Sequence, residues 1–316
     1  MKRLFTLLTL TAAIAFAQTA TAQVKKPFLW ELSKNGKTAT LFGSLHVGKP
    51  DFYPVPTFVR TRFDAADVIA VEVDVTRDDT RVACNRLAAT NEKLDKLLPE
   101  EEMQQLSRYA KASGLDLKKL DGRKLWMVNL ILTVTELTQL GVDFEDGIDL
   151  VITREAYFQK KRVVEVEGPK QCTSLAGADG PEAVAGMNRF LTAVRENKME
   201  RRINDMIAAY RIGDGEAIAK ITVDEFGDSP IGKRSRQRIF DDRHGPMAET
   251  IDGYLAKNEK HFIAIGVAHM HGPTNLLQAL EKRGIKVTPL VADSVLQAPA
   301  TAAPPAAAKP AEQPKK

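Results

Sequence analysis

Short apolar runs alternate along the chain with longer runs of helical periodicity. Four of the short runs are rich in β-branched or apolar residues and contain or end at glycine or charged residues, and each predicts a buried strand. The predicted strands cover residues 38–46, 68–75, 161–168 and 261–269. Because helical runs separate most of them, the pattern predicts an α/β fold with a mostly parallel or mixed central sheet flanked by helices.

Helical patterns fill the segments between the predicted strands. They cover residues 99–114, 124–141, 147–161 and 275–290, the last two leading into strands. The run 124–141 is apolar around most of its circumference, which predicts a buried helix. Residues 181–220 predict two helices separated by a break at Gly213-Asp214-Gly215. We expect the helical insertions at 99–140 and 181–221 to form a cap over the sheet.

The two ends differ in composition from the rest of the chain. Residues 1–22 combine two basic residues, an apolar run and a small-residue cleavage site, the layout of a secretory signal peptide. Residues 298–316 are rich in alanine and proline and predict a disordered tail. Residues 23–297 are predicted to form the α/β domain. We therefore expect a protein secreted across the inner membrane, periplasmic or extracellular, with no transmembrane segment in its mature form.

Charge and cysteine usage narrow the possible partners. The chain has a net charge of +4, but two basic residues of the predicted signal peptide contribute +2, and the predicted tail contributes another +2. The nearly neutral remainder lacks the basic surface of a nucleic-acid-binding protein. Cys84 and Cys172 are too few for a cysteine-ligated zinc site, and in an exported protein we expect them to form a disulfide.

Two copies of a Gly-x-x-His motif mark the candidate chemistry. Gly43 and His46 end the first predicted strand, and Gly266 and His269 end the last. Each glycine allows the backbone to turn sharply or to pack closely just before its histidine. In open α/β sheets ligands bind beyond the carboxyl ends of strands, so the two imidazoles are predicted to reach one site, as in a histidine/carboxylate metal centre.

Carboxylates occupy the other two predicted strands. Glu72 and Asp74 share one face by the period of two, and Glu165 and Glu167 do the same. A carboxylate in an apolar strand is costly to bury unless it is paired or binds a metal. Asp149, at the start of a predicted helix, is either a further ligand or a helix cap.

The remaining histidines are weaker candidates. His261 follows a charged turn and is predicted to lie on the surface. His271 lies two residues after His269 and either assists the site or faces solvent. His244 follows Arg243 on a predicted helix.

These motifs resemble those of the TraB/GumN family, which includes the Tiki proteases. The resemblance rests on "FLWELSKNGKTATLFGSLHVGKPDFYPVP", "ADVIAVEVD", "GIDLVITREAYFQKKRVVEVEGPKQ" and "FIAIGVAHMHGPTNLLQALEKRGIKVTPL". It implies a fold related to erythromycin esterase and to a haem-binding, ChaN-like group. For Tiki-like members it implies a metal-dependent peptidase that uses Mn²⁺ or Co²⁺, with Zn²⁺ as a further option.

The resemblance also implies roles for single residues. The matching positions are Gly43, His46, Glu72, Asp149, Glu167, Gln171, Arg243, Gly266 and His269. The family usually has asparagine after the arginine, where this chain has His244. The expected metal ligands are His46 and His269 with Glu167 or Glu72, and the other carboxylate is the expected general base. Arg243 is expected to stabilise an oxyanion, and Asp149, His244 and His271 are possible supporting residues.

Three functions follow from these residues as hypotheses. The first is an exported metal-dependent hydrolase, chiefly a peptidase, that acts on a peptide or another envelope substrate. The second is a metal-independent, esterase-like hydrolase in which a His/Glu pair activates water. The third is a non-catalytic protein that binds haem, a metal or an envelope polysaccharide. The oligomeric state is left open.

Overall fold

The computed structural model describes residues 26–178 and 180–290. The predicted signal peptide, residues 1–22, and the whole predicted tail, residues 298–316, lie outside these ranges. Within the described residues, no helix combines the length and the apolar character needed to cross a membrane.

A mixed six-stranded sheet forms the centre of the described part, which confirms the predicted α/β fold class. The strands are β1 (Leu29–Lys34), β2 (Lys37–Ser44), β3 (Val68–Val71), β4 (Arg162–Glu165), β5 (His261–Gly266) and β6 (Lys286–Pro289). Their order is β4-β3-β5-β2-β1-β6, and β4, β3, β5 and β2 run parallel. Strand β1 is antiparallel to both of its neighbours, β2 and β6. Its pairing with β2 is a hairpin, because Asn35 and Gly36, both with positive φ, turn the chain tightly between the two strands.

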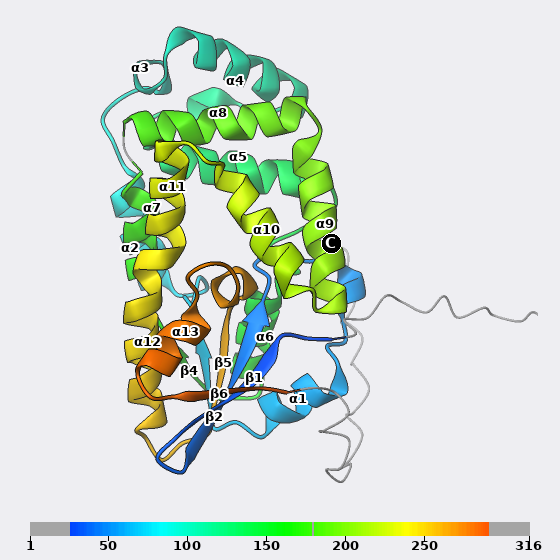
Figure 1. The fold of residues 1–316 in the computed structure, drawn as a ribbon. Coiled ribbons are helices and arrows are strands. Elements are labelled where there is room, and N and C mark those ends of the chain that lie inside the picture. The colour runs from blue at the N-terminus through cyan, green and yellow to red at the C-terminus, as the bar shows by residue number, and fades with distance from the viewer. Residues whose placement is uncertain (1–25, 179, 291–316) are drawn as a thin grey trace, which may run out of the picture.

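Helices surround the sheet and extend beyond one of its ends (Figure 1). They are α1 (Thr57–Asp64), α2 (Asp78–Ala88), α3 (Leu94–Leu97), α4 (Glu100–Ser113), α5 (Leu125–Gln139), α6 (Ile148–Phe158), α7 (Lys170–Ala176), α8 (Pro181–Arg195), α9 (Lys198–Ile212), α10 (Gly215–Phe226), α11 (Pro230–Arg236), α12 (Asp242–Leu255) and α13 (Leu276–Lys282). Short 3₁₀ turns occur at η1 (Pro50–Phe52), η2 (Leu117–Leu120) and η4 (Val267–Met270), and a π-helical turn at η3 (Gln237–Asp241).

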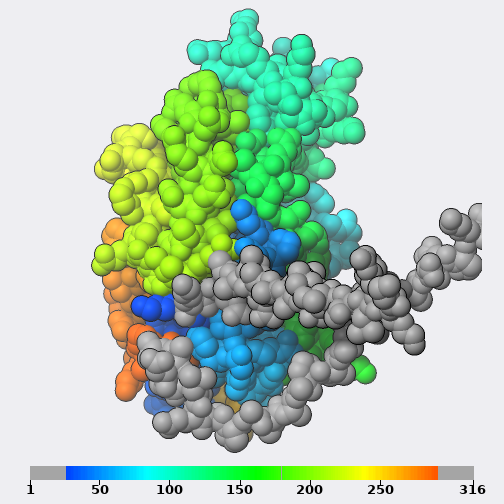
Figure 2. Space-filling view, turned by 90° about the vertical axis from the view of Figure 1, so that its right-hand side faces the viewer, coloured from blue at the N-terminus to red at the C-terminus, as the bar shows by residue number. Residues whose placement is uncertain are grey.

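Two hydrophobic cores lie in the described part of the chain, one around the sheet and one among the helices beyond its end. The larger packs both faces of the sheet and includes the fully buried Leu41, Ile69 and Phe262. The smaller lies among α4, α5 and α8 and includes Leu106 and Leu132. Figure 2 shows the helices of the smaller core forming the part of the molecule farthest from the sheet, and we call them the helical lobe.

The structure corrects several details of the predicted elements. Strand β3 ends at Val71 and β4 at Glu165, so Glu72 and Glu167 follow their strands instead of lying inside them. Residues 181–220 belong to three helices instead of two, because Asn197 adopts a positive φ of 53° and separates α8 from α9. Helix α5 is apolar on two sides because one side packs in the lobe and the other lines a cavity.

The predicted disulfide is present between Cys84 on α2 and Cys172 on α7, with the Cα atoms 5.4 Å apart. It joins segments 88 residues apart in sequence, and both cysteines line a cavity of about 560 Å³. A crosslink over a long loop stabilises the fold chiefly by restricting the unfolded chain.

Replacing both cysteines with alanine is therefore expected to lower the free energy of unfolding by about 2–4 kcal/mol. Urea unfolding of the oxidised protein and of the double variant measures the difference. Reduction of the parent protein should give a similar loss. Equal midpoints for all three samples would contradict a stabilising crosslink.

Candidate active site

The candidate site lies where three neighbouring parallel strands end. His46 follows β2 by two residues, Glu72 follows β3 directly, and His269 lies in the turn η4 after β5. Ser44 pairs with Gly266, and Val71 pairs with Ala264, so the strand ends lie at the same edge of the sheet. This edge is where α/β sheets place their ligands.

Glu72 is the centre of the site. Its side chain is only 3% exposed, and both imidazoles present Nε2 to it. The Nε2 of His46 lies 3.8 Å from Oε2, and the Nε2 of His269 lies 3.8 Å from Oε1. The two histidines, 223 positions apart in sequence, therefore meet around one carboxylate.

The other ring nitrogen of each histidine, Nδ1, contacts a neighbouring side chain. The Nδ1 of His46 lies 3.1 Å from a carboxylate oxygen of Asp149, in the first turn of α6. The Nδ1 of His269 lies 3.1 Å from the Nε2 of His244 on α12. Such contacts fix the orientation and tautomer of an imidazole and leave its Nε2 free for a ligand.

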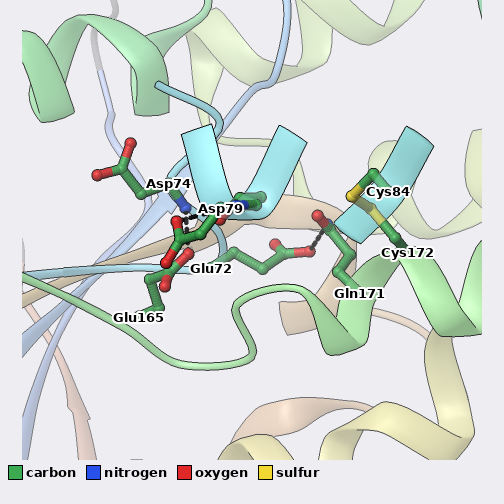
Figure 3. The surroundings of a disulfide bond; sticks show 8 residues. Glu72, Asp74, Asp79, Cys84, Glu165, Gln171 and Cys172 are labelled. Atoms are coloured by element: carbon green, nitrogen blue, oxygen red, sulfur yellow. Dashed lines mark hydrogen bonds between the residues drawn. A yellow bond between two sulfur atoms is a disulfide. The ribbon is translucent and has the colours of Figure 1, made fainter. Parts of the chain in front are cut away.

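Arg243 joins Glu72 to Glu167. Its Nη2 contacts both carboxylates, its Nε donates to Glu167 Oε1 at 3.0 Å, and its Nη1 donates to the Ile239 carbonyl at 2.8 Å. Gln171 donates a further hydrogen bond to Glu72 from the first turn of α7, beside the disulfide (Figure 3). Glu167 therefore pairs with Arg243 and contacts neither imidazole within the described residues.

Burial and charge set the protonation states. Enclosure by protein disfavours a charged His46 ring, but Asp149 and Glu72 outweigh this and raise its pKa to about 9. Burial lowers the pKa of His269 to about 3 and that of His244 to about 4, so both are neutral near pH 7. Burial alone would raise the pKa of Glu72, yet the two imidazoles and Arg243 hold it well below its usual range.

A cavity of about 560 Å³ opens above these groups. His46, Glu72 and His269 line it, and its other walls are largely apolar side chains such as Trp126, Leu130 and Phe240. The His46 side chain is 43% exposed, whereas those of Glu72 and His269 are each 3% exposed. The site is therefore open to solvent chiefly on the His46 side.

The two motif glycines have different roles. A Cβ atom on Gly43 would lie 2.8 Å from the Cβ of Phe28, so this glycine permits close packing under the site. A Cβ atom on Gly266 would lie 3.1 Å from Nε2 of His46 and 3.5 Å from Oε2 of Glu72. Gly266 therefore keeps open the space between an imidazole and the central carboxylate.

Replacing Gly266 with alanine is expected to reduce any catalytic activity of this site by about 10–100-fold, because a small displacement of reacting groups is costly. Its φ of −50° suits any residue, so the free energy of unfolding should change little. Steady-state rates and urea unfolding measure the two effects. Gly253→Ala on α12, with open space around the new Cβ atom, is the matched control. Equal activity in the two variants would show that the space is not used.

The donor chemistry at this point suits a divalent metal. Two imidazole nitrogens and a carboxylate are ordinary ligands of Zn²⁺ and related ions. The 3.8 Å separations exceed the edge of about 3.3 Å expected for ligands at tetrahedral distances. In the described part of the chain no three His, Cys, Asp or Glu side chains are already arranged to hold a metal. The chemistry fits, and ligation requires the three side chains to move closer.

Other predicted candidates lie outside this group. Asp74 accepts hydrogen bonds from Thr76 and Tyr157, and its backbone N–H donates to Glu165 at 2.8 Å (Figure 3). His261 was predicted on the surface but is buried, because its ring stacks on Tyr254.

His271 neither assists the site nor faces open solvent. Its ring packs edge-on against Phe28, with ring centroids 5.1 Å apart, and lies over Gly215.

Sequence reasoning missed Phe240, whose ring centroid lies 4.9 Å from that of His269. It belongs to η3, the π-helical turn directly before Arg243. Such turns often occur at functional sites, but the sequence offers no period that reveals one.

The fold and site define an α/β protein with a histidine/carboxylate centre at the carboxyl edge of its sheet. Residues 28–289 match the TraB/PrgY/gumN family, and the chain belongs to this family.

Two relatives extend the comparison. The chain is 27% identical over 241 residues to the uncharacterized protein YbaP of Escherichia coli, covering 76% of this chain and 86% of that protein. It is 21% identical over 323 residues to the metalloprotease TIKI homolog of Amphimedon queenslandica, covering 86% of this chain and 63% of that protein. No solved structure matches the chain.

Proposed function

We propose that this protein is a metal-dependent hydrolase that cleaves peptide bonds. The observation that carries the proposal is the convergence of two imidazole Nε2 atoms on one buried carboxylate, at the floor of a large cavity. The distant relationship to a metalloprotease homolog supports the same class of reaction.

Charge at the site supports a bound cation. Glu72, Asp149 and Glu167 lie around the two imidazoles, and among the described residues Arg243 is the only lysine or arginine that forms an ion pair with Glu72 or Glu167. The raised pKa of His46 reflects this excess of negative charge, which favours a cation near its Nε2. The single positive charge of a protonated His46 compensates only part of this negative charge, whereas a divalent metal would bring two positive charges.

We infer that His46, Glu72 and His269 hold the metal, with Mn²⁺ or Co²⁺ expected from the family resemblance. When bound, the metal would polarise a carbonyl and make water available as hydroxide near neutral pH. Asp149 and His244 would hold the two rings in place. Arg243 would keep Glu72 and Glu167 ionised and oriented. This role differs from the oxyanion contact expected from the sequence, because its three nitrogens already donate to carboxylates and a carbonyl.

A second candidate is a hydrolase that needs no metal. The contact of Asp149 with Nδ1 of His46 leaves Nε2 directed at the cavity, which is the arrangement of an oriented general base. That role needs only one histidine, whereas the Nε2 atoms of two histidines converge on Glu72, as a metal site requires. The metal-dependent hydrolase is therefore the better supported of the two.

Chelation separates these candidates. Incubation with EDTA followed by desalting is expected to lower hydrolysis of a diverse peptide library by about 100-fold or more, because the metal carries the activation of water. Adding Mn²⁺ or Co²⁺ should restore the rate, and mass spectrometry of the products measures it. An unchanged rate after chelation would favour the second candidate. Metal binding without any turnover would favour a binding protein.

The same proposal includes export. A disulfide between the only two cysteines suits an oxidising compartment outside the cytoplasm. We therefore propose a periplasmic or extracellular location and a peptide or other envelope substrate.

A further inference from the structure

A second cavity of about 430 Å³ adjoins the one above the catalytic groups. It lies among α5 and α8 of the helical lobe, helices α9 and α10, and the turn η3. The two cavities share four lining residues, Met206, Ile239, Phe240 and Ala268. A group bound beside His269 can therefore extend towards the second cavity, past Phe240.

Phe240 separates the two cavities. Its ring centroid lies 4.9 Å from that of His269, which lines the first cavity. On the other side it lies 6.0 Å, edge to face, from the ring of Phe226, which lines the second. Phe240 is carried by the π-helical turn that leads into Arg243, so one short segment positions both this partition and the arginine that contacts Glu72.

The walls of the second cavity are mostly apolar. Leu137, Phe190, Ile203, Met206, Ile221 and Phe226 line it, together with the paired Arg202 and Glu225. The lining therefore suits an apolar group.

We propose that the second cavity binds an apolar side chain of a peptide substrate, at a residue next to the bond cleaved, and that Phe240 limits the size of that side chain. This inference rests on the proposed peptidase function. A peptide with its scissile bond beside His269 would place a neighbouring apolar side chain in this cavity, because the two cavities meet at Phe240. The cavity is larger than one side chain, so passage beside Phe240 would set the size limit.

A library of capped peptides, varied at one position on either side of a fixed bond, tests the proposal. The parent protein should cleave peptides with Leu, Met or Phe at one position about 10–200-fold faster, by kcat/KM, than those with Gly or Asp, the range for differences in hydrophobic pockets. Phe240→Ala should shift the preference towards Trp by at least about 10-fold relative to Leu. Phe158→Ala, which changes a side chain 83% exposed at the end of α6, should change neither ratio.

A filling variant gives an independent test that does not depend on Phe240. Ile221→Trp places a bulky indole ring in the second cavity. It should remove the preference for apolar side chains at the varied peptide position, while peptides with Gly at that position are still cleaved. Circular dichroism checks that each variant folds. Cleavage of all peptides at equal rates would overturn the inference and leave the proposed function in place. Hydrolysis of long-chain acyl esters without any peptide cleavage would overturn both.

Discussion

Replacing His46 with alanine is expected to reduce hydrolysis by about 10²–10⁴-fold while leaving the protein folded. The loss follows because His46 is the site group most exposed to the cavity and presents its Nε2 beside the buried Glu72. Removing one positioned group of this kind typically costs a factor of this size. Its side chain is 43% exposed, so the variant should remain folded, although it loses the contacts of this ring with Asp149 and Glu72.

Three measurements define this test. Rates on the peptide library give the loss of activity, urea unfolding gives the stability, and elemental analysis of the purified protein gives the metal content. Metal should be lost together with activity, since His46 is an expected ligand. His271→Ala, which removes an imidazole outside the site, is the matched control and should keep both. Parent-like rates for the His46 variant in the presence of metal would refute the assigned site.

The second large effect is expected from Arg243→Leu, which should lower the free energy of unfolding by about 3–5 kcal/mol. The Arg243 side chain is 7% exposed, and those of its partners Glu72 and Glu167 are 3% and 7% exposed. Leucine would leave two buried carboxylates near each other without their guanidinium. Breaking a buried pair in this way is costly because the remaining charge is neither solvated nor compensated.

A surface pair supplies the control for this variant. Arg81 lies 2.7 Å from Asp78 on α2, and both side chains are largely exposed. Arg81→Leu should therefore change stability by no more than about 1 kcal/mol. Adding Glu167→Gln to the Arg243 variant should recover part of the loss, because one uncompensated charge is removed. Similar unfolding midpoints for the two arginine variants would show that Arg243 does not stabilise the carboxylates.

The sequence by itself identified the class of fold and the motifs that the structure brings together at the strand ends. The predicted strands at 38–46 and 261–269 overlap β2 and β5, and both Gly-x-x-His motifs lie at the same edge of the sheet, as neighbouring parallel strands require. The pairing of Cys84 with Cys172 also followed from composition and the expected compartment. The strand inferences succeeded because they depend on local periodicity and on the topology of parallel strands, and the disulfide inference because two cysteines allow only one pairing within the chain.

Some local signals were present in the sequence and were not used. The Asn35-Gly36 pair between two apolar runs indicates a hairpin, and it marks β1, which the strand prediction omitted. Asn197, which separates α8 from α9, has a left-handed backbone conformation, and asparagine adopts this conformation more readily than most residues.

Only the tertiary structure decided which carboxylate meets the imidazoles. Glu72 and Glu167 have similar sequence surroundings, but α12 places Arg243 between them, and Glu72 alone lies beside both histidines. The same packing buries His261 against Tyr254 and directs His271 away from the site. Contacts between residues 76 and 171 positions apart depend on how helices pack against the sheet. A period of 2 or 3.6 residues specifies the face that a side chain occupies, but it does not specify its partner.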